Sequence, residues 1–390
     1  MLRVLYFVHD LADPAVRRRV MMLEAGGAEV MLAGFRRADD MAPDLAALDP
    51  VDLGRTADGR FAQRLVAIAS AAASLGARLR RMPRPDVIIG RNLEMLALAA
   101  RARAIFSADI PIVYECLDIH RLLLGKGSVS RAMRGAERVL GHKASLLMTS
   151  SPAFVRDYFQ RLGQMDAPVA LLLNKVLELD GPTDLPGEAV APLGTGEPWI
   201  IGWFGALRCR KSLALLSEFT RRMEGRFEVI LRGRPAYSEF SGFDAFITAE
   251  PFMRFEGPYR NPEDLAGIYR AVRFSWAIDF FEEGLNSSWL LPNRLFEGCR
   301  HGAVPIAMKG TETGRFLSDR HMGVLLDEPT PQALVERLGS VEPAYRQLRD
   351  RIVAEDLQTW VCDLSECRTL VARLSALRPD HAGATILQAA

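Results

Sequence analysis

The chain has 390 residues, of which 49% are hydrophobic and 25% charged, and its net charge is +1. A chain of this length exceeds one comfortable core and should form two domains. The near-neutral charge excludes the strongly basic surface of a nucleic-acid-binding protein.

Three further features favour a cytoplasmic enzyme. The five cysteines include no CxxC pair, which suits a reducing compartment. A strand-like run begins at Leu2, so no secretory signal is expected. No apolar run reaches the roughly 18 residues that a membrane span needs.

Strand-like apolar runs alternate with helical patterns through the first half of the chain. The predicted strands cover residues 4–8, 29–35, 86–90, 111–115, 146–150 and 169–173, and the helical patterns cover 15–27, 92–106 and 131–144. This alternation predicts a parallel sheet with helices on its faces.

The second half repeats this rhythm after a stretch dense in Gly and Pro. Strands are predicted at 199–205, 227–233, 253–257, 273–279, 303–308 and 322–326, with helices at 213–223 and 293–302. We therefore expect an α/β protein of two doubly wound, Rossmann-like domains facing a cleft. Their predicted extents are 1–180 and 199–375, with a linker at 181–198 and a flexible tail at 378–390.

Residues 279–305 form the most informative segment, because polar side chains crowd the loop between a strand and a short helix. A strand, loop and helix in this order place backbone N–H groups where phosphate binds. The segment therefore predicts a nucleotide-diphosphate pocket. Its polar side chains are Glu282, Glu283, Asn286, Asn293, Arg294 and Glu297.

Three cations follow the strand at 199–205, namely Arg208, Arg210 and Lys211, and Ser212 is the expected helix N-cap. Such a turn can bind a diphosphate, or its charges can simply solvate a helix start. The turn ending the next strand at Gly233 can line the same cleft or only reverse the chain. The second half has no Walker A loop, and neither half has a G-x-G-x-x-G after its first strand, which disfavours a nicotinamide oxidoreductase.

Polar residues also follow the strands of the first half. Asp10 can contact an acceptor or cap the next helix, and Asn92 has the same two readings. The segment after residue 114 brings Glu115, Asp118 and His120 to a strand end. His120 can hydrogen-bond a ligand hydroxyl or accept a proton, and Asp118 can act as a general base.

The motifs of the second half, taken in order, resemble the GT-B glycosyltransferases. More narrowly, they resemble the large retaining group that builds bacterial polysaccharides and glycolipids. The resemblance covers most of residues 199–328, and the first half looks more loosely like the acceptor-side domain of that group. The motifs are G-x-L-x-x-x-K from Gly205, G-x-P from Gly233, F-x-G from Phe255, E-G-L from Glu283, P-N-R-L-F-E from Pro292 and G-A-V-P from Gly302 to Pro305.

The resemblance implies a role for each matching residue. Lys211 would neutralise the donor diphosphate with help from Arg208 or Arg210, and Glu297 would hydrogen-bond the nucleotide ribose. His120 would lie beside the donor sugar. The remaining expected donor-binding residues are Gly205, Gly233, Gly284, Leu285, Asn286, Asn293, Arg294 and Leu295.

The chain departs from the family at the first of its two paired glutamates. The family spaces the pair eight positions apart, but Glu283 lies fourteen positions before Glu297. Either the loop carries an insertion of six residues, or the first glutamate is replaced and Glu283 is incidental. We favour the insertion, which leaves Glu283 as a catalytic candidate and the backbone amides near Gly284 free to face the donor.

The expected function is transfer of a sugar from a nucleotide-diphosphate sugar to a lipid-linked saccharide in bacterial surface polysaccharide synthesis. Retention of configuration is favoured, and neither a metal nor another cofactor is expected. The arginines of segment 60–84 can contact anionic lipid at the inner face of the membrane, or the segment is an ordinary surface helix. The alternative functions are a nucleotide-sugar epimerase of the same fold and a non-catalytic nucleotide-sugar-binding module.

Overall fold

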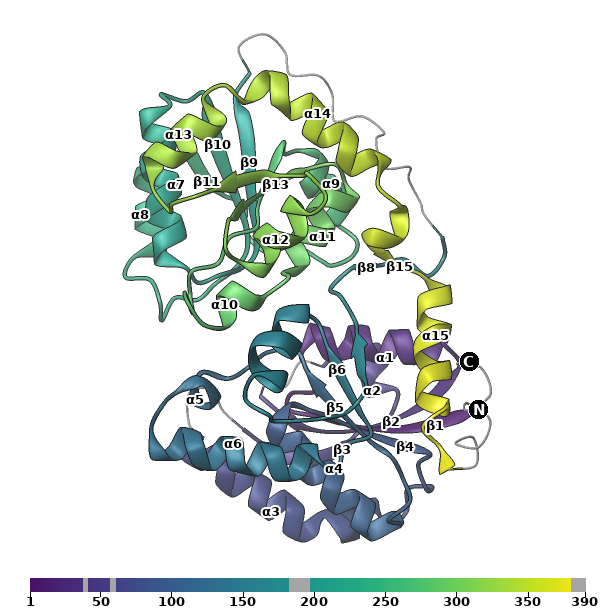
Figure 1. Cartoon of the computed structure of the whole chain (residues 1–390). Helices are drawn as coiled ribbons and strands as arrows, with labels where there is room; N and C mark the ends of the chain where they lie inside the picture. Colours follow the sequence, from purple (N-terminus) through teal and green to yellow (C-terminus); the bar gives the residue numbers. More distant parts are fainter. Residues whose placement is uncertain (38–40, 57–60, 182–196, 380–390) are drawn as a thin grey trace. The chain divides into compact units, whose positions relative to one another are not determined.

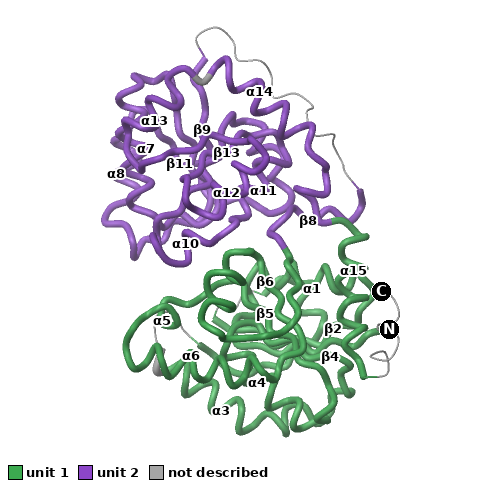
Figure 2. Tube along the Cα trace, in the orientation of Figure 1, with its two compact units in different colours: residues 1–172, 363–390 green, residues 173–362 purple. Residues whose placement is uncertain are grey.

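A computed structural model describes residues 1–37, 41–56, 61–181 and 197–379 (Figure 1). The chain divides into two compact units (Figure 2). Unit 1 comprises residues 1–172 and 363–390, and unit 2 comprises residues 173–362. The chain therefore passes from one unit to the other twice.

This division moves both of the domain boundaries expected from the sequence. Residues 173–180 belong to unit 2, where β8 (Val176–Leu177) pairs with β15 (Val361–Cys362). Helix α15 (Leu364–Ser375) belongs to unit 1, where it packs against α1 (Pro14–Ala25). These contacts join segments far apart in the sequence, so no local pattern indicates them. The expected linker and tail lie largely outside the described residues.

Unit 1 contains a parallel sheet of strand order β3-β2-β1-β4-β5-β6-β7. Every strand predicted for this half is present, and β3 is an edge strand that the patterning missed. The central strands are buried on both faces, as continuous apolar runs require in a parallel sheet. The strands are β1 (Leu2–Val8), β2 (Ala28–Arg36), β3 (Val51–Arg55), β4 (Val87–Arg91), β5 (Ile112–Cys116), β6 (Leu146–Thr149) and β7 (Val169–Leu171).

The helices of unit 1 cover both faces of its sheet. In Figure 1, α1 and α15 lie on one side, and α3, α4 and α6 lie on the other. The other helical segments, besides α1 and α15, are α2 (Pro43–Ala46), α3 (Phe61–Leu79), α4 (Asn92–Phe106), α5 (Arg121–Leu124), α6 (Ser128–Gly141) and the π-helix η1 (Phe154–Gln160).

Unit 2 repeats the arrangement with a parallel sheet of order β11-β10-β9-β12-β13-β14, and every strand predicted for this half is present. Its main core lies between the sheet and its helices and includes Trp203, Trp276 and Phe296. The strands of the sheet are β9 (Trp199–Leu207), β10 (Phe227–Pro235), β11 (Met253–Phe255), β12 (Phe274–Trp276), β13 (Val304–Met308) and β14 (Val324–Leu326).

The helices of unit 2 also lie on both faces of their sheet. In Figure 1, α7, α8 and α13 lie to one side, and α9, α11 and α14 to the other. Their bounds, with those of the remaining short helices, are α7 (Arg210–Arg222), α8 (Phe243–Ala249), α9 (Leu265–Arg270), α10 (Asn286–Trp289), α11 (Asn293–Arg300), α12 (Glu312–Ser318), α13 (Pro331–Leu338), α14 (Val341–Ala354) and the 3-10 turn η2 (Leu357–Thr359).

Strand order reverses direction between β1 and β4 in unit 1 and between β9 and β12 in unit 2. At such a point the loops after the two strands run in opposite directions, which opens a crevice at their carboxyl ends where ligands bind. The two α/β units therefore each have one position at which a ligand site is expected.

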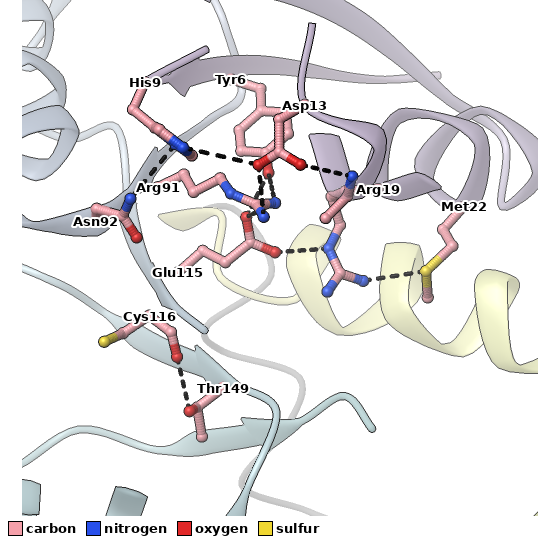
Figure 3. A network of polar contacts seen from close by, with 11 residues as sticks. Tyr6, His9, Asp13, Arg19, Met22, Arg91, Asn92, Glu115, Cys116 and Thr149 are labelled. Atoms are coloured by element: carbon pink, nitrogen blue, oxygen red, sulfur yellow. Dashed lines mark hydrogen bonds and ion pairs between the residues drawn. The ribbon is translucent and has the colours of Figure 1, made fainter. Parts of the chain in front are cut away.

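A buried ion network holds the strand ends of unit 1 together (Figure 3). The Glu115 carboxylate is fully buried, and it accepts a hydrogen bond of 2.6 Å from Arg19 Nε on α1. Arg91 Nη1 lies 3.5 Å from the other Glu115 oxygen, which also accepts from the Tyr6 hydroxyl. The network links β1, β4, β5 and α1.

Two opposing effects set the pKa of Glu115. Burial raises the pKa of this carboxyl, but the charges of Arg19 and Arg91 and the hydrogen bonds from Tyr6 and Arg19 outweigh burial, so the pKa is lowered. Glu115 was expected to reach a ligand from its strand end. The structure corrects this expectation, because the side chain points into the protein, where Arg19, Arg91 and Tyr6 contact both of its oxygens.

We predict that Glu115→Gln lowers the free energy of unfolding by about 3–5 kcal/mol at neutral pH, because two buried arginines lose their counter-charge. A carboxyl whose folded pKa is lowered stabilises the protein above its unfolded pKa, and this stabilisation is lost as pH falls through the folded pKa. The difference in unfolding free energy between the variant and wild type should therefore narrow as the pH falls. Urea unfolding at a series of pH values from neutral to acid measures this difference.

Glu29→Gln serves as the control, because Glu29 is an exposed glutamate of the same unit. Its unfolding free energy should stay within about 0.5 kcal/mol of wild type. Equal stability of Glu115→Gln and wild type at neutral pH would contradict the assigned network.

Candidate donor and acceptor sites

The three predicted cations of unit 2 lie at the end of β9 and the start of α7. Helix α7 begins at Arg210, and its N-cap is Cys209, whose sulfur accepts from the Ser212 N–H at 3.3 Å. The prediction that Ser212 caps this helix is wrong, because Ser212 lies inside the first turn and is fully buried.

Lys211 is held by the loop that follows β12. Its Nζ donates to both oxygens of Glu283, at 2.6 and 2.7 Å, and lies 4.5 Å from the centre of the Phe280 ring. The side chains of Lys211 and Glu283 are about half exposed, at 42% and 51%. The ion pair is therefore open to solvent and to a competing anion.

Arg208 also pairs with a carboxylate of the loop after β12, Asp279, which precedes Glu283 in that loop. Its Nη2 donates to Asp279 at 3.2 Å, and its guanidinium lies 4.7 Å from the centre of the Phe281 ring. Burial raises the pKa of Asp279, but Arg294 and Arg208 outweigh burial, and the pKa is lowered. Arg210 instead turns toward the backbone carbonyl of Glu239. Of the two candidate arginines, Arg208 thus shares the loop with Lys211.

Glu297 lies on α11, and only 5% of it is exposed. One carboxylate oxygen accepts from Asn261 Nδ2 and the other from the Tyr269 hydroxyl, each at 3.0 Å. A carboxylate oxygen can accept more than one hydrogen bond. The sequence did not single out Asn261 or Tyr269, because their approach to Glu297 depends on the fold.

The residues between Glu283 and Glu297 include a short helix, α10, and the choice between insertion and replacement stays a prediction. Two side chains of α10 hold the preceding loop: Ser287 Oγ accepts from Glu282 N at 2.9 Å, and Ser288 Oγ accepts from Gly284 N at 3.2 Å. The amide of Leu285 donates to the Glu282 carbonyl. The expectation that the amides of Gly284 and Leu285 are free for a donor is therefore corrected.

The other expected donor-binding residues differ in their exposure. Asn293 is exposed at the first turn of α11, and Arg294 is nearly buried and donates to the Ile278 carbonyl at 3.0 Å. Leu295 is fully buried in the core, and the Asn286 side chain is almost as deeply buried. The expectation of a donor contact for the Leu295 side chain is corrected, since its position on α11 faces the sheet.

Gly205 and Gly233 face each other where β9 pairs with β10. A Cβ on Gly233 would lie 1.9 Å from the Gly205 carbonyl oxygen, and Gly233 has φ +131°. Both the approach and the backbone angle therefore require glycine at 233. This contact gives Gly233 a packing role, whatever its part in binding.

A cavity of about 200 Å³ opens beside the loop that carries Glu283. It lies past the carboxyl ends of β12 and β13, within unit 2. Polar groups on its wall include Asp279, Glu283, Ser287, Lys309 and Thr311. The cavity thus places hydroxyl and charged groups next to the Lys211 ion pair.

In unit 1, the loop after β1 places His9, Asp10 and Asp13 at the point where strand order reverses. Asp13 is the N-cap of α1 and accepts from Ala15 N at 2.8 Å. Asp10 accepts from Ala12 N at 3.0 Å and so shapes the loop. The capping alternative for Asp10 is therefore wrong, because Asp13 caps the helix.

Asn92 stands at the carboxyl end of β4, opposite this loop. It has φ +70°, and its Nδ2 lies 3.4 Å from His9 Nδ1. The N-cap position of α4 is Arg91, so the capping alternative for Asn92 is also wrong. Glu94, on the same helix, pairs with Arg64 of α3 at 2.7 Å.

Asp118 and His120 are both exposed in the loop after β5. His120 is the N-cap of α5, and its Nδ1 accepts from Leu122 N at 3.2 Å. Neutral His120 therefore carries its proton on Nε2, where it can donate to a hydroxyl. Burial and the nearby Arg64 lower the pKa of His120. Its basic nitrogen is occupied, which favours the hydrogen-bonding alternative over the proton-accepting one.

Among the described residues, no group of three or more His, Cys, Asp or Glu side chains is arranged to hold a metal ion. Within the same residues, no helix is long and apolar enough to cross a membrane. All five cysteines are buried, and none of them forms a disulfide. The expectation that no metal is needed stays a prediction.

Comparison with known proteins identifies a close relative. The chain is 59% identical over 382 residues to the succinoglycan biosynthesis protein ExoL of Rhizobium meliloti (strain 1021), covering 97% of this chain and 94% of that protein. No protein-family model matches the chain.

Solved structures show the same fold at low sequence identity. Sucrose-phosphate synthase from Thermosynechococcus elongatus aligns with a TM-score of 0.68 at 14% identity, covering 96% of this chain and 98% of that one. HepE from Anabaena, in complex with UDP and glucose, aligns with a TM-score of 0.65 at 16% identity, covering 96% and 99%. The lipopolysaccharide outer core galactosyltransferase WaaB gives 0.63 at 14%, covering 96% and 99%.

These likenesses confirm the α/β fold of two Rossmann-like units and the resemblance on which it was expected. The chain belongs to the family of the succinoglycan biosynthesis protein ExoL, and it has the GT-B fold of the solved glycosyltransferases.

Proposed function

We propose that unit 2 binds a UDP-sugar through Lys211 and Arg208 and that the sugar passes to a saccharide acceptor bound by unit 1. The observation that carries this proposal is the pair of cations between the end of β9 and the first turn of α7. Each cation pairs with a carboxylate of the loop after β12, Lys211 with Glu283 and Arg208 with Asp279. A diphosphate offers the same kind of oxygen ligand with more charge.

Binding of the diphosphate would displace Glu283 from Lys211. The Lys211–Glu283 pair is half exposed, and such pairs contribute only about 0.2–1 kcal/mol. Charge-assisted bonds to phosphate are stronger, so the exchange favours the donor. The freed Glu283 then lies beside the cavity next to its loop, where it can meet the hydroxyls of the donor sugar.

Glu297 is suited to hold the ribose. Asn261 and Tyr269 orient its carboxylate, and the two oxygens of a carboxylate can accept from the two vicinal hydroxyls of a ribose. The choice of uracil as the base follows the structural neighbour HepE, which was solved with UDP and with UDP-glucose. Recognition of UDP by this chain is our proposal.

We propose that the reaction retains the anomeric configuration. The bond from the sugar C1 to the diphosphate oxygen breaks as the acceptor oxygen attaches on the same face. The proton of the acceptor hydroxyl passes to the departing phosphate oxygen. His120 supports this route because its Nδ1 already accepts a backbone N–H, so it would donate to a hydroxyl through Nε2. Asp118 is the general base that the inverting alternative would use.

We further propose that the acceptor is lipid-linked and that the enzyme works in the cytoplasm at the inner face of the membrane. Helix α3 exposes Leu65 and Val66, at 48% and 69%. Arg80 and Arg81 are exposed just after its end. Leu65 and Val66 lie near the start of α3, and exposed apolar side chains and arginines along one helix suit an anionic lipid surface.

We predict that Lys211→Ala weakens UDP binding about tenfold to a hundredfold, because a charge-assisted contact to the diphosphate is lost. Glu283→Gln should instead tighten UDP binding about two- to fivefold, because the competitor for Lys211 loses its charge. Calorimetric titration with UDP, GDP and ADP measures both effects and identifies the base.

The Arg254–Glu228 ion pair provides matched controls, since it lies on β11 and β10 of the same unit. Arg254→Ala and Glu228→Gln should leave UDP affinity unchanged within about twofold. Failure of wild type to bind any nucleoside diphosphate would overturn the proposed function. An epimerised nucleotide sugar formed without acceptor would favour the epimerase instead.

We predict that a UDP-α-sugar yields an α-linked product, because attack occurs on the face that the diphosphate leaves. The anomeric proton coupling in the NMR spectrum of the product distinguishes the two outcomes. A β-linked product, abolished by Asp118→Asn, would establish the inverting route.

We predict that the double variant Leu65→Ser/Val66→Ser binds anionic phospholipid vesicles about tenfold more weakly than wild type. Co-sedimentation measures the bound fraction. The double variant Val129→Ser/Val139→Ser is the control, because these residues are similarly exposed on α6, at 55% and 62%. Equal loss in both variants, or no vesicle binding by wild type, would rule out a specific contact through α3.

A further inference from the structure

The loop after β1 and the start of α4 face each other where the strand order of unit 1 reverses. His9 and Asp13 come from the loop, and Asn92 comes from the end of β4 (Figure 3). In open parallel sheets, ligands bind at this position. Of these three residues, sequence reasoning named only Asn92 as a binding residue.

The three side chains approach one another without closing tight hydrogen bonds. Asn92 Nδ2 lies 3.4 Å from His9 Nδ1, and His9 Nε2 lies 3.7 Å from Asp13 Oδ2. Direct hydrogen bonds between such atoms are shorter, at about 2.7–3.2 Å. The groups are therefore aligned but incompletely satisfied, and both His9 and Asp13 keep about a fifth of their side-chain surface exposed.

The buried network beneath them fixes their positions. Arg91 Nη2 lies 3.3 Å from Asp13 Oδ2, and Arg91 Nη1 accompanies Tyr6 and Glu115 inside the protein. Asp13 is also tied to the start of α1 through its other oxygen. Asn92 adopts a left-handed backbone angle, which is uncommon outside glycine but which asparagine tolerates best. Strain of this kind concentrates at functional sites.

The charge of the cluster favours a neutral ligand. Arg91 is matched by Asp13 and Glu115, and Asp13 presents a carboxylate that would repel phosphate. Burial and the charges of Arg91, Arg37 and Arg64 lower the pKa of His9 to about 4, against the opposing effect of Asp13. The imidazole is therefore neutral at physiological pH. When Asn92 donates to Nδ1 of His9, the proton of the neutral imidazole is on Nε2, which faces Asp13.

We propose that His9, Asp13 and Asn92 form a hydroxyl-binding subsite for the terminal sugar of the acceptor. A hydroxyl placed between His9 and Asp13 would accept from the His9 Nε2–H and donate to the carboxylate. A neighbouring hydroxyl would bond the amide of Asn92. This pattern of one acceptor, one donor and one amide suits a vicinal diol. The inference rests on the proposed function, since it assigns the acceptor to unit 1.

His9→Phe and Asn92→Gly test the subsite. The first variant keeps a ring, and the second keeps the left-handed backbone angle. Each should raise the acceptor KM about fivefold to tenfold by removing one or two hydrogen bonds. The donor KM and the rate of UDP-sugar hydrolysis without acceptor should stay within twofold of wild type. Asp13→Asn, which keeps an N-cap residue, should act in the same direction.

A direct binding measurement does not depend on turnover. Octyl β-glucoside and octyl β-galactoside, below their micelle concentrations, are titrated into the full chain while the His9 imidazole resonances are followed by NMR. A saturable shift with either glycoside is expected, with an apparent affinity about fivefold to tenfold weaker in Asn92→Gly. Inorganic phosphate should cause no such shift. Arg17→Gln is the control, because Arg17 lies on α1, which Asp13 caps, and its side chain pairs with Asp44 of α2 at the surface.

The outcomes separate the subsite from the proposed function. Normal UDP binding with an unmoved His9 resonance, and an unchanged acceptor KM in His9→Phe and Asn92→Gly, would overturn the subsite alone. A response to phosphate but not to the glycosides would also overturn it, because the ligand would then be an anion. Loss of UDP binding in wild type would instead remove the proposed function itself. Melting temperatures identify any variant that has lost its fold.

Discussion

A charge withdrawn from water at the end of a strand must be matched by an opposite charge, and both units depend on this requirement. In unit 1, Glu115 is enclosed by Arg19 and Arg91. In unit 2, Asp279 lies between Arg208 and Arg294. An unmatched buried charge would cost several kcal/mol, so these partners dictate how the loops leave their strands. The candidate sites are built on loops held in this way.

Much of the fold was predictable because parallel strands that are buried on both faces have continuous apolar sequences. All of the predicted strands are present. The edge strand β3 was missed because its sequence mixes Val and Leu with Asp, Gly and Arg. The pairing of β8 with β15 was missed because two-residue strands carry no period, and each is defined only by a partner far along the chain.

The site was predictable as a set of residue types at strand ends, but not as a set of contacts. Lys211 and Glu283 are 72 positions apart in sequence, and their ion pair depends on the β9–β12 adjacency. Whether Arg208 or Arg210 turns toward the loop depends on where α7 begins. The expected N-cap was Ser212, but the structure places the N-cap at Cys209. Glu115 looked like a ligand-facing carboxylate because sequence cannot distinguish the two faces of a fully buried strand.

The double passage of the chain between its units has a consequence for synthesis. Helix α15 covers α1, and a Cβ on Gly26 at the end of α1 would lie 2.4 Å from the Cys367 carbonyl oxygen. This packing joins residues far apart in the sequence, with the whole of unit 2 between them. Unit 2 is therefore completely synthesised before α15 can cover α1. On the ribosome, α1 is made long before the helix that packs on it.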